Sequence, residues 1–179
     1  MKDYLKYLFQ LILSPGHGWE DIEKGDERPE RLLVSGYYPI IAIAALSVML
    51  GLLHHGVFIT LFLRAIVWFV VLFVGYFFGV FMLSVFVEPM VEKYDEAKCQ
   101  TFALFTLGLE AVILVLYNVF PFAFFVITFL PCYVALIQWK GAQYMQVKPQ
   151  KVGLFMILSI FGVLMPPYVF YYLFSLILG

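Results

Sequence analysis

Charged side chains are scarce in this sequence of 179 residues, where Asp, Glu, Lys and Arg together make up 13%. That share is about half of what a soluble domain carries. Hydrophobic residues account for 64% of the chain, and its mean hydropathy is +0.96. One small core cannot bury so much apolar surface, so part of it must face lipid. The composition argues against a soluble enzyme or a disordered chain and indicates an integral membrane protein.

Cysteine and excess basic charge are also lacking. The two cysteines, Cys99 and Cys132, form no CxxC pair, which argues against a disulfide framework or a zinc knuckle. His54 and His55 are adjacent and so do not share a helix face, which favours a solvated turn over a metal site. Eleven basic residues stand against twelve acidic ones, leaving no basic excess for nucleic acid. We therefore expect no metal, no cofactor and no nucleic-acid partner.

Motifs of hydrolytic enzymes are absent as well. The sequence contains no GxSxG, no HExxH and no Gly-rich phosphate loop. No pair of carboxylates falls within one apolar stretch, as an intramembrane aspartyl protease requires. We expect no catalytic residue and no enzymatic activity.

Five apolar stretches are long enough, or nearly so, to cross a bilayer, which takes about 20 helical residues. They cover residues 32–53, 57–87, 101–117, 121–139 and 152–178. The pattern predicts an all-α polytopic membrane bundle of five transmembrane helices over residues 32–179, preceded by an N-terminal segment over 1–31. We also expect the adjacent prolines Pro166 and Pro167 to break or kink the last helix near its middle.

The basic residues predict the orientation of this bundle. Residues 1–36 hold five Lys or Arg, the second connection holds two and the fourth holds three. The first connection, the third connection and the C-terminal end hold none. Because basic residues concentrate on the cytoplasmic side of membrane proteins, the N-terminus is expected in the cytoplasm and the C-terminus outside.

The N-terminal segment begins with an amphipathic pattern. Asp3, Lys6 and Gln10 are spaced three and four apart, which places them in one polar line on a helix too short to span a bilayer. Such a helix either lies in the cytoplasmic interface, with its apolar side chains in lipid, or packs on the helical bundle. A second short helix is expected around Trp19.

Two charged residues lie inside the apolar stretches, Arg64 in residues 57–87 and Glu110 in residues 101–117. Ionised groups are costly within a bilayer and tend to pair or to line a polar cavity. Each lies seven residues from the same end of the bundle, a depth of about 10 Å at about 1.5 Å per residue. We predict that Arg64 and Glu110 form an intramembrane ion pair. That pair serves either to fix the helix register or to bind or couple a ligand. The alternative to a pair is that Arg64 extends outward to the membrane surface while Glu110 stays protonated.

Several short segments resemble a known family. Near the N-terminus they are Leu11-Ile12-Leu13-Ser14-Pro15 and Trp19-Glu20-Asp21-Ile22, and further on they are Tyr133-Val134-Ala135-Leu136, Trp139-Lys140-Gly141, Tyr144-Met145 and Val147-Lys148-Pro149-Gln150-Lys151. Together they resemble prokaryotic members of the Yip family, the five-span proteins named for Rab/Ypt-interacting proteins of the eukaryotic secretory pathway. The resemblance covers roughly residues 8 to 175. It implies a non-enzymatic protein of the prokaryotic inner membrane that acts through protein partners, homo-oligomerisation or shaping of the bilayer.

Two functions follow as expectations. The first is a membrane adaptor or organiser, whose cytoplasmic segments mix both charge signs with aromatic side chains, a mixture that protein contacts favour. Its candidate partner-binding residues are Trp19, Glu20, Asp21, Glu92, Tyr94 and Lys148. The second is a small transporter or channel component that uses Arg64 and Glu110.

Overall fold

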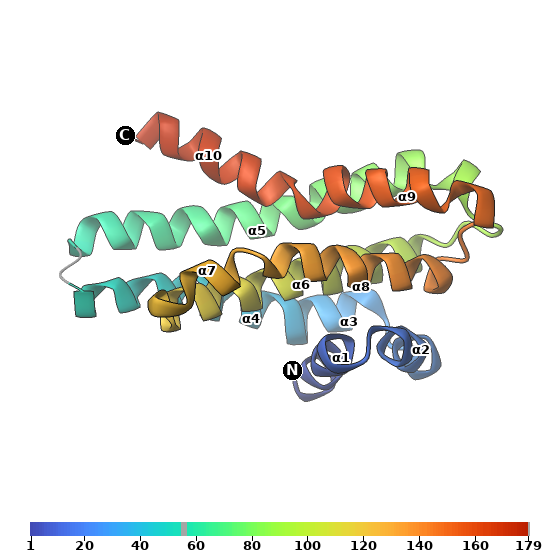
Figure 1. Cartoon of the computed structure of the whole chain (residues 1–179), viewed down its shortest axis with the longest axis horizontal. Helices are drawn as coiled ribbons and strands as arrows, with labels where there is room; N and C mark the ends of the chain where they lie inside the picture. Colours follow the sequence, from blue (N-terminus) through green and yellow to red (C-terminus); the bar gives the residue numbers. More distant parts are fainter. Residues whose placement is uncertain (55–56, 179) are drawn as a thin grey trace.

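The computed structural model describes residues 1–54 and 57–178, and within these ranges the chain is helical without any β-strand. Figure 1 shows a long bundle of roughly parallel rods, with two short helices, α1 and α2, lying across one side of it. The α-helices are α1 (Lys2–Leu13), α2 (Pro15–Gly25), α3 (Pro29–Leu32), α4 (Tyr38–Ser47), α5 (Phe58–Phe86), α6 (Glu96–Val119), α7 (Phe124–Ile127), α8 (Leu130–Tyr144), α9 (Val152–Ser159) and α10 (Pro166–Leu178). The turn predicted at residues 54–56 lies partly outside the described residues.

Four of the rods are long and apolar enough to cross a membrane. They cover Pro29–Leu52, Phe58–Phe86, Glu96–Val119 and Pro149–Ile177. A fifth crossing is present if Pro121–Ile127 and Leu130–Tyr144, which meet at an angle of 45°, count as one bent span. The prediction of an all-α bundle is confirmed, and that of five spans depends on this bent pair.

The rods are not uniform α-helices. A π-helical turn, Leu33–Tyr37, joins α3 to α4, and the 3₁₀ segment Val48–His54 continues that rod. A second π-helical turn, Ile160–Leu164, joins α9 to α10 just before Pro166. The helix interruption predicted at Pro166 and Pro167 is therefore confirmed, because proline lacks the N–H that would continue the α-helical hydrogen bonds.

Helix α6 begins five residues earlier than the predicted span at 101. The carboxylate of Asp95 caps it by accepting hydrogen bonds from the backbone N–H groups of Ala97 at 2.9 Å and Lys98 at 3.4 Å. A capping side chain supplies partners for N–H groups that have none inside the helix. The polar first turn, predicted to be a loop, is therefore helical.

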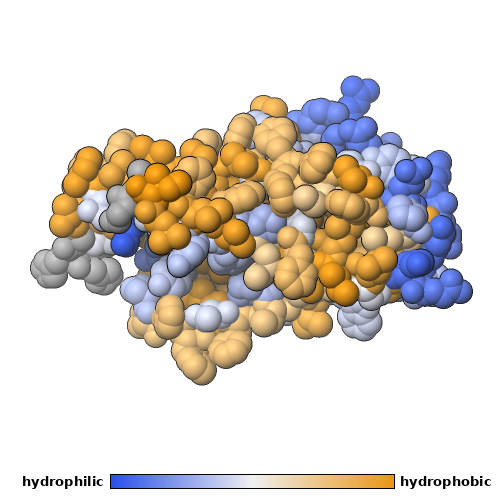
Figure 2. Space-filling model, turned by 90° about the horizontal axis from the view of Figure 1, so that it is seen from above, coloured by the Kyte–Doolittle hydropathy of each residue, from blue (hydrophilic) through white to orange (hydrophobic). Residues whose placement is uncertain are grey.

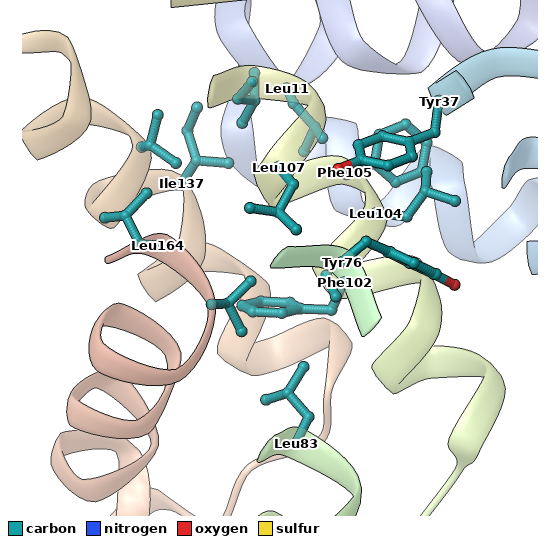
Figure 3. Packing of buried hydrophobic residues seen from close by; sticks show 14 of the residues in the cluster. Leu11, Tyr37, Tyr76, Leu83, Phe102, Leu104, Phe105, Leu107, Ile137 and Leu164 are labelled. Atoms are coloured by element: carbon teal, nitrogen blue, oxygen red, sulfur yellow. The ribbon is translucent and has the colours of Figure 1, made fainter. Parts of the chain in front are cut away.

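Helix α6 also forms the centre of the core. Phe102, Leu104, Phe105 and Leu107 are fully buried, and Figure 3 shows them meeting side chains from the surrounding helices. Tyr37 ties the first rod to the second, because its hydroxyl donates a 2.7 Å hydrogen bond to the carbonyl of Leu72. The resulting bundle holds α5 and α6 side by side, as consecutive antiparallel helices are expected to lie.

Helix α1 packs on the bundle through one face. Tyr4, Leu8 and Leu11 are buried, and the Tyr4 hydroxyl donates a 3.1 Å hydrogen bond to the carbonyl of Leu104. Burial raises the pKa of Tyr4, so the hydroxyl keeps the proton that it donates. The opposite face leaves Phe9 and Leu13 exposed. Helix α1 therefore packs on the bundle, which is one of the two predicted alternatives. Contact of its exposed face with lipid, the other alternative, stays a prediction.

The polar residues gather at one end of the molecule. Figure 2 shows hydrophilic side chains at the end where α5 connects to α6 and α8 connects to α9, with apolar surface along the bundle. The charged end consists of the two connections at this end of the bundle, residues 88–95 and 145–151. An isolated bridge between Val91 and Val147 joins the two connections. The opposite, apolar end holds the connections from α4 to α5 and from α6 to α7.

Candidate functional site

A cavity of about 440 Å³ lies between α5, α6, α10 and the break between α7 and α8. Its position near the start of α5 places it in the half of the bundle away from the charged end. It is lined by Val48, Arg64, Trp68, Leu72, Glu110, Ile113, Leu114, Tyr117, Asn118, Ile127, Thr128, Pro131, Pro167, Tyr168 and Tyr171. Its volume falls within the range of small-molecule sites, about 300 to 1,000 Å³.

Glu110 is the buried acid of this cavity, with 5% of its surface exposed. Its Oε2 accepts a short hydrogen bond from the hydroxyl of Tyr168 on α10. Its Oε1 is buried and has no hydrogen-bond partner in the described part of the chain. Buried polar atoms are nearly always paired, and an unpaired one calls for an explanation such as a bound ligand.

Arg64 lies on α5 at the same cavity, but its side chain is exposed. Four ion pairs form between described residues, and none of them joins Arg64 to Glu110. The direct ion pair predicted from sequence is therefore not formed in the structure. The matched depth did bring both residues to one cavity. However, the depth of a residue does not fix which way its side chain points around the helix axis.

Tyr168 is the functional candidate that the sequence analysis missed. It follows directly after Pro166 and Pro167, at the start of α10, and its hydroxyl takes the place at Glu110 that was predicted for Arg64. The adjacent prolines were the available signal, since they predict a helix break and breaks in membrane helices often lie at binding sites.

Aromatic side chains line the cavity beside these polar groups. The rings of Trp68 on α5 and Tyr171 on α10 stack with centroids 4.3 Å apart and an angle of 18° between their planes. Tyr117 lies on the α6 side of the cavity. Such walls accept both apolar groups and the N–H groups of a cation.

Both helix interruptions in the second half of the chain meet the cavity. Thr128 and Pro131 flank the break between α7 and α8, and Pro167 and Tyr168 lie at the start of α10. Irregular backbone at membrane depth is tolerated where it lines a cavity or is buried in protein. Paired helix interruptions around one cavity are typical of transporter binding sites.

Trp19, a candidate for partner binding, lies in the core instead, with 2% of its surface exposed. Its ring stacks on Phe102, with centroids 5.4 Å apart, and on Tyr144, with centroids 5.1 Å apart. Its Nε1 donates a 2.9 Å hydrogen bond to the carbonyl of Ile137. The prediction that Trp19 contacts a partner is wrong for this structure, because the indole anchors α2 to α6 and α8.

The neighbours of Trp19 on α2 make local contacts. Glu20 is exposed and lies within 4.0 Å of His17 and Lys24, at 3.6 Å and 3.8 Å. Asp21 accepts a 2.6 Å hydrogen bond from Nε2 of Gln10 and so ties α2 to α1. Such exposed pairs contribute little stability.

The remaining candidates lie on the two joined connections of the charged end. The N–H of Glu92 donates to the carbonyl of Gln146 and the N–H of Lys148 donates to the carbonyl of Met90, both at 2.9 Å. The structure therefore brings Glu92 and Lys148 together from two different connections. Tyr94, in the same connection as Glu92, is 38% exposed.

Comparison of the chain with models of protein families, with curated proteins and with solved structures finds no match. The resemblance to the Yip family stays a prediction.

Proposed function

We propose that this chain is a multi-pass membrane protein that binds a small polar ligand in the Glu110 cavity, as a transporter or channel component does. The observation that carries the proposal is Glu110, a buried acid that lines a cavity of about 440 Å³ and whose Oε1 has no hydrogen-bond partner among the described residues. Leaving a buried acceptor unpaired costs about 1–3 kcal/mol. A ligand that donates a hydrogen bond to Oε1 removes this cost.

The contacts around Glu110 favour ligand binding over a purely structural role. Glu110 uses Oε2 on a neighbouring helix, and its Oε1 has no donor among the described residues. Side-chain oxygens of Gln10, Thr106 and Gln138 also lack a partner there, but of these four residues Glu110 is the one that lines the cavity. Arg64, the basic residue in the lining, lies at the same cavity with an exposed side chain. The cavity therefore offers an acceptor and a cation that a ligand can bind separately.

The proposal includes an orientation. The ten basic residues other than Arg64 lie in the N-terminal segment, at the charged end, or, for Lys98 and Lys140, in the adjoining parts of α6 and α8. This distribution supports a cytoplasmic N-terminus and charged end. With five crossings the C-terminus is outside, and the Glu110 cavity lies in the outer half of the membrane. We place the protein in a prokaryotic inner membrane by its resemblance to the Yip family, and we propose that it has no enzymatic activity.

The experiment is mild-detergent purification from native membranes followed by mass spectrometry of co-purified small molecules. Wild type, Glu110→Gln and Thr106→Ala are compared, the last being a buried polar control on the same helix. We expect a molecule that is retained by wild type and the control and lost from Glu110→Gln. Equal retention by all three, or no bound molecule in any folded variant, would contradict the proposal.

A second candidate function is the adaptor or organiser of the Yip-family type. The observation that favours it is the joined pair of connections at the charged end, which holds Glu92, Tyr94 and Lys148 on backbone fixed by hydrogen bonds. A fixed surface with both charge signs and an exposed aromatic ring suits a protein partner or a second copy of the chain. A photo-crosslinker at position 94 that captures no protein in native membranes would count against this candidate.

A further inference from the structure

We propose that the ligand of the Glu110 cavity is a phospholipid whose head group carries a phosphate and a primary ammonium, as phosphatidylethanolamine does. The ammonium binds Oε1 of Glu110, and the phosphate binds the guanidinium of Arg64. This assignment rests on the proposed function and names the class of ligand.

Two opposite charges share the cavity without meeting each other. Glu110 and Arg64 both line it, and no ion pair between the described residues joins them. A ligand with one charge would satisfy one of the two side chains and leave the other in apolar surroundings, which is costly. A zwitterion with its charges separated by a short linker satisfies both.

The unpartnered atom specifies the kind of cation. Oε1 of Glu110 is an acceptor without a donor, and a primary ammonium supplies three N–H donors. The quaternary ammonium of a choline head group carries no N–H and leaves this oxygen unpaired. The aromatic rings of Tyr117 and Tyr171 at the cavity wall add attraction for a cation.

Arg64 specifies the anion. The planar guanidinium forms paired hydrogen bonds with phosphate oxygens. The residues one helical turn from Arg64 are Thr60 and Leu61 before it and Val67 and Trp68 after it. Leu61 and Val67 are buried and Trp68 lines the cavity, so this side of α5 faces the bundle, while the Arg64 side chain itself is exposed. An arginine at this depth requires an anion, which a lipid head group can supply.

The size of the cavity and its surroundings fit a lipid rather than a free zwitterion. A volume of about 440 Å³ holds a head group but not two acyl chains, which therefore remain in the surrounding bilayer. Helix α10 diverges from α5 toward the C-terminus (Figure 1), and Leu173 and Leu176 are exposed along it. Apolar side chains thus border the route along which the acyl chains would lie.

The test measures lipid binding to the purified full chain in detergent by native mass spectrometry. Dioleoyl phosphatidylethanolamine, phosphatidylcholine and phosphatidylglycerol are titrated separately, and soluble phosphoethanolamine serves as a competitor. The variants are Glu110→Gln, which keeps a side chain of the same shape, and Arg64→Gln at an exposed position. Glu27→Gln and Arg31→Gln are the matched controls, because the half-buried Glu27 and the exposed Arg31 form an ion pair 3.3 Å apart outside the cavity.

We expect phosphatidylethanolamine to bind wild type and both controls at least about tenfold more tightly than it binds Glu110→Gln or Arg64→Gln, since each variant loses a charge-assisted hydrogen bond. The two other lipids should bind more weakly to wild type and should bind Glu110→Gln as well as they bind wild type, because neither head group carries an ammonium N–H for Oε1. Equal binding of the three lipids, or equal binding by all variants, would overturn the assignment. Tighter binding of soluble phosphoethanolamine than of the lipid would also overturn it, with a soluble zwitterion as the ligand.

The failure of this assignment is distinguishable from failure of the proposed function. If native membranes yield another molecule that is lost from Glu110→Gln, the cavity is a ligand site and only the lipid class is wrong. If every folded variant retains the same molecules and the same lipid affinities as wild type, both proposals fail.

Discussion

Glu110 is the one charged side chain that is buried among the described residues, and Tyr168 is its one hydrogen-bond partner there. Tyr168→Phe should therefore lower the free energy of unfolding by about 1–3 kcal/mol, because both carboxylate oxygens then lack a donor. Denaturation in a series of detergent mixtures, followed by helical circular dichroism, measures this change.

A double variant separates the loss of the hydrogen bond from the cost of leaving the buried carboxyl group unpaired. Glu110→Leu combined with Tyr168→Phe should recover part of the stability lost in Tyr168→Phe, since removing both partners leaves no buried polar group unpaired. A double variant that is less stable than the sum of the two single variants would contradict this pairing.

Trp19 has a structural role at the level of a single side chain. Trp19→Ala should cost about 3–5 kcal/mol, the usual loss for deleting a buried aromatic residue. Trp19→Phe should cost less, because the ring can still stack on Phe102 and Tyr144 while the hydrogen bond to Ile137 is lost. The same unfolding assay measures both, and a Trp19→Ala variant as stable as wild type would indicate that α2 does not depend on this anchor.

At the scale of the helices, close approach at Gly141 holds α8 against α6 and α2. A Cβ atom added there would lie 2.7 Å from Phe102 and 2.9 Å from Trp19. Gly141→Ala should therefore destabilise the protein by about 1–3 kcal/mol through overpacking. The matched control is Gly153→Ala on α9, where nothing lies within 4 Å of the added atom and where alanine favours the helix. The prediction fails if Gly141→Ala is at least as stable as Gly153→Ala.

The helices could be predicted from sequence to the extent that they are apolar. Residues 57–87 correspond closely to α5, and the prolines at 166 and 167 marked the interruption before α10. The early start of α6 was missed because a side-chain cap at Asp95, rather than an apolar run, begins that helix. The bend between α7 and α8 was also missed, although Pro131 in the first turn of α8 is a residue that interrupts a continuous helix.

The candidate site was predictable in its location but not in its contacts. Equal depth placed Arg64 and Glu110 at one cavity, because helix rise converts sequence distance into depth. The partner of Glu110 comes from 58 positions away, and no local pattern specifies such a contact. Trp19 was misassigned for a similar reason, since an aromatic ring in a charged segment fits a core anchor as well as a contact surface.

At the scale of the whole molecule, the charged end and the Glu110 cavity should lie toward opposite sides of the membrane. A Cys132→Ser background leaves Cys99, which is buried, as the remaining native cysteine. In this background, the cysteine of Val57→Cys marks the apolar end and the cysteine of Lys148→Cys marks the charged end. An impermeant maleimide should label Val57→Cys from outside in right-side-out vesicles and Lys148→Cys in inside-out vesicles. Labelling of both positions from one side would contradict the proposed orientation.

The most direct test of the Glu110 cavity as a ligand site is a crystal structure of the wild-type protein grown in a lipidic phase containing phosphatidylethanolamine. We expect electron density between Oε1 of Glu110 and the guanidinium of Arg64, with the Tyr168 hydroxyl still bound to Oε2. An empty cavity in which the Arg64 guanidinium itself contacts the Glu110 carboxylate would contradict the ligand site. That result would restore the ion pair that the sequence predicts.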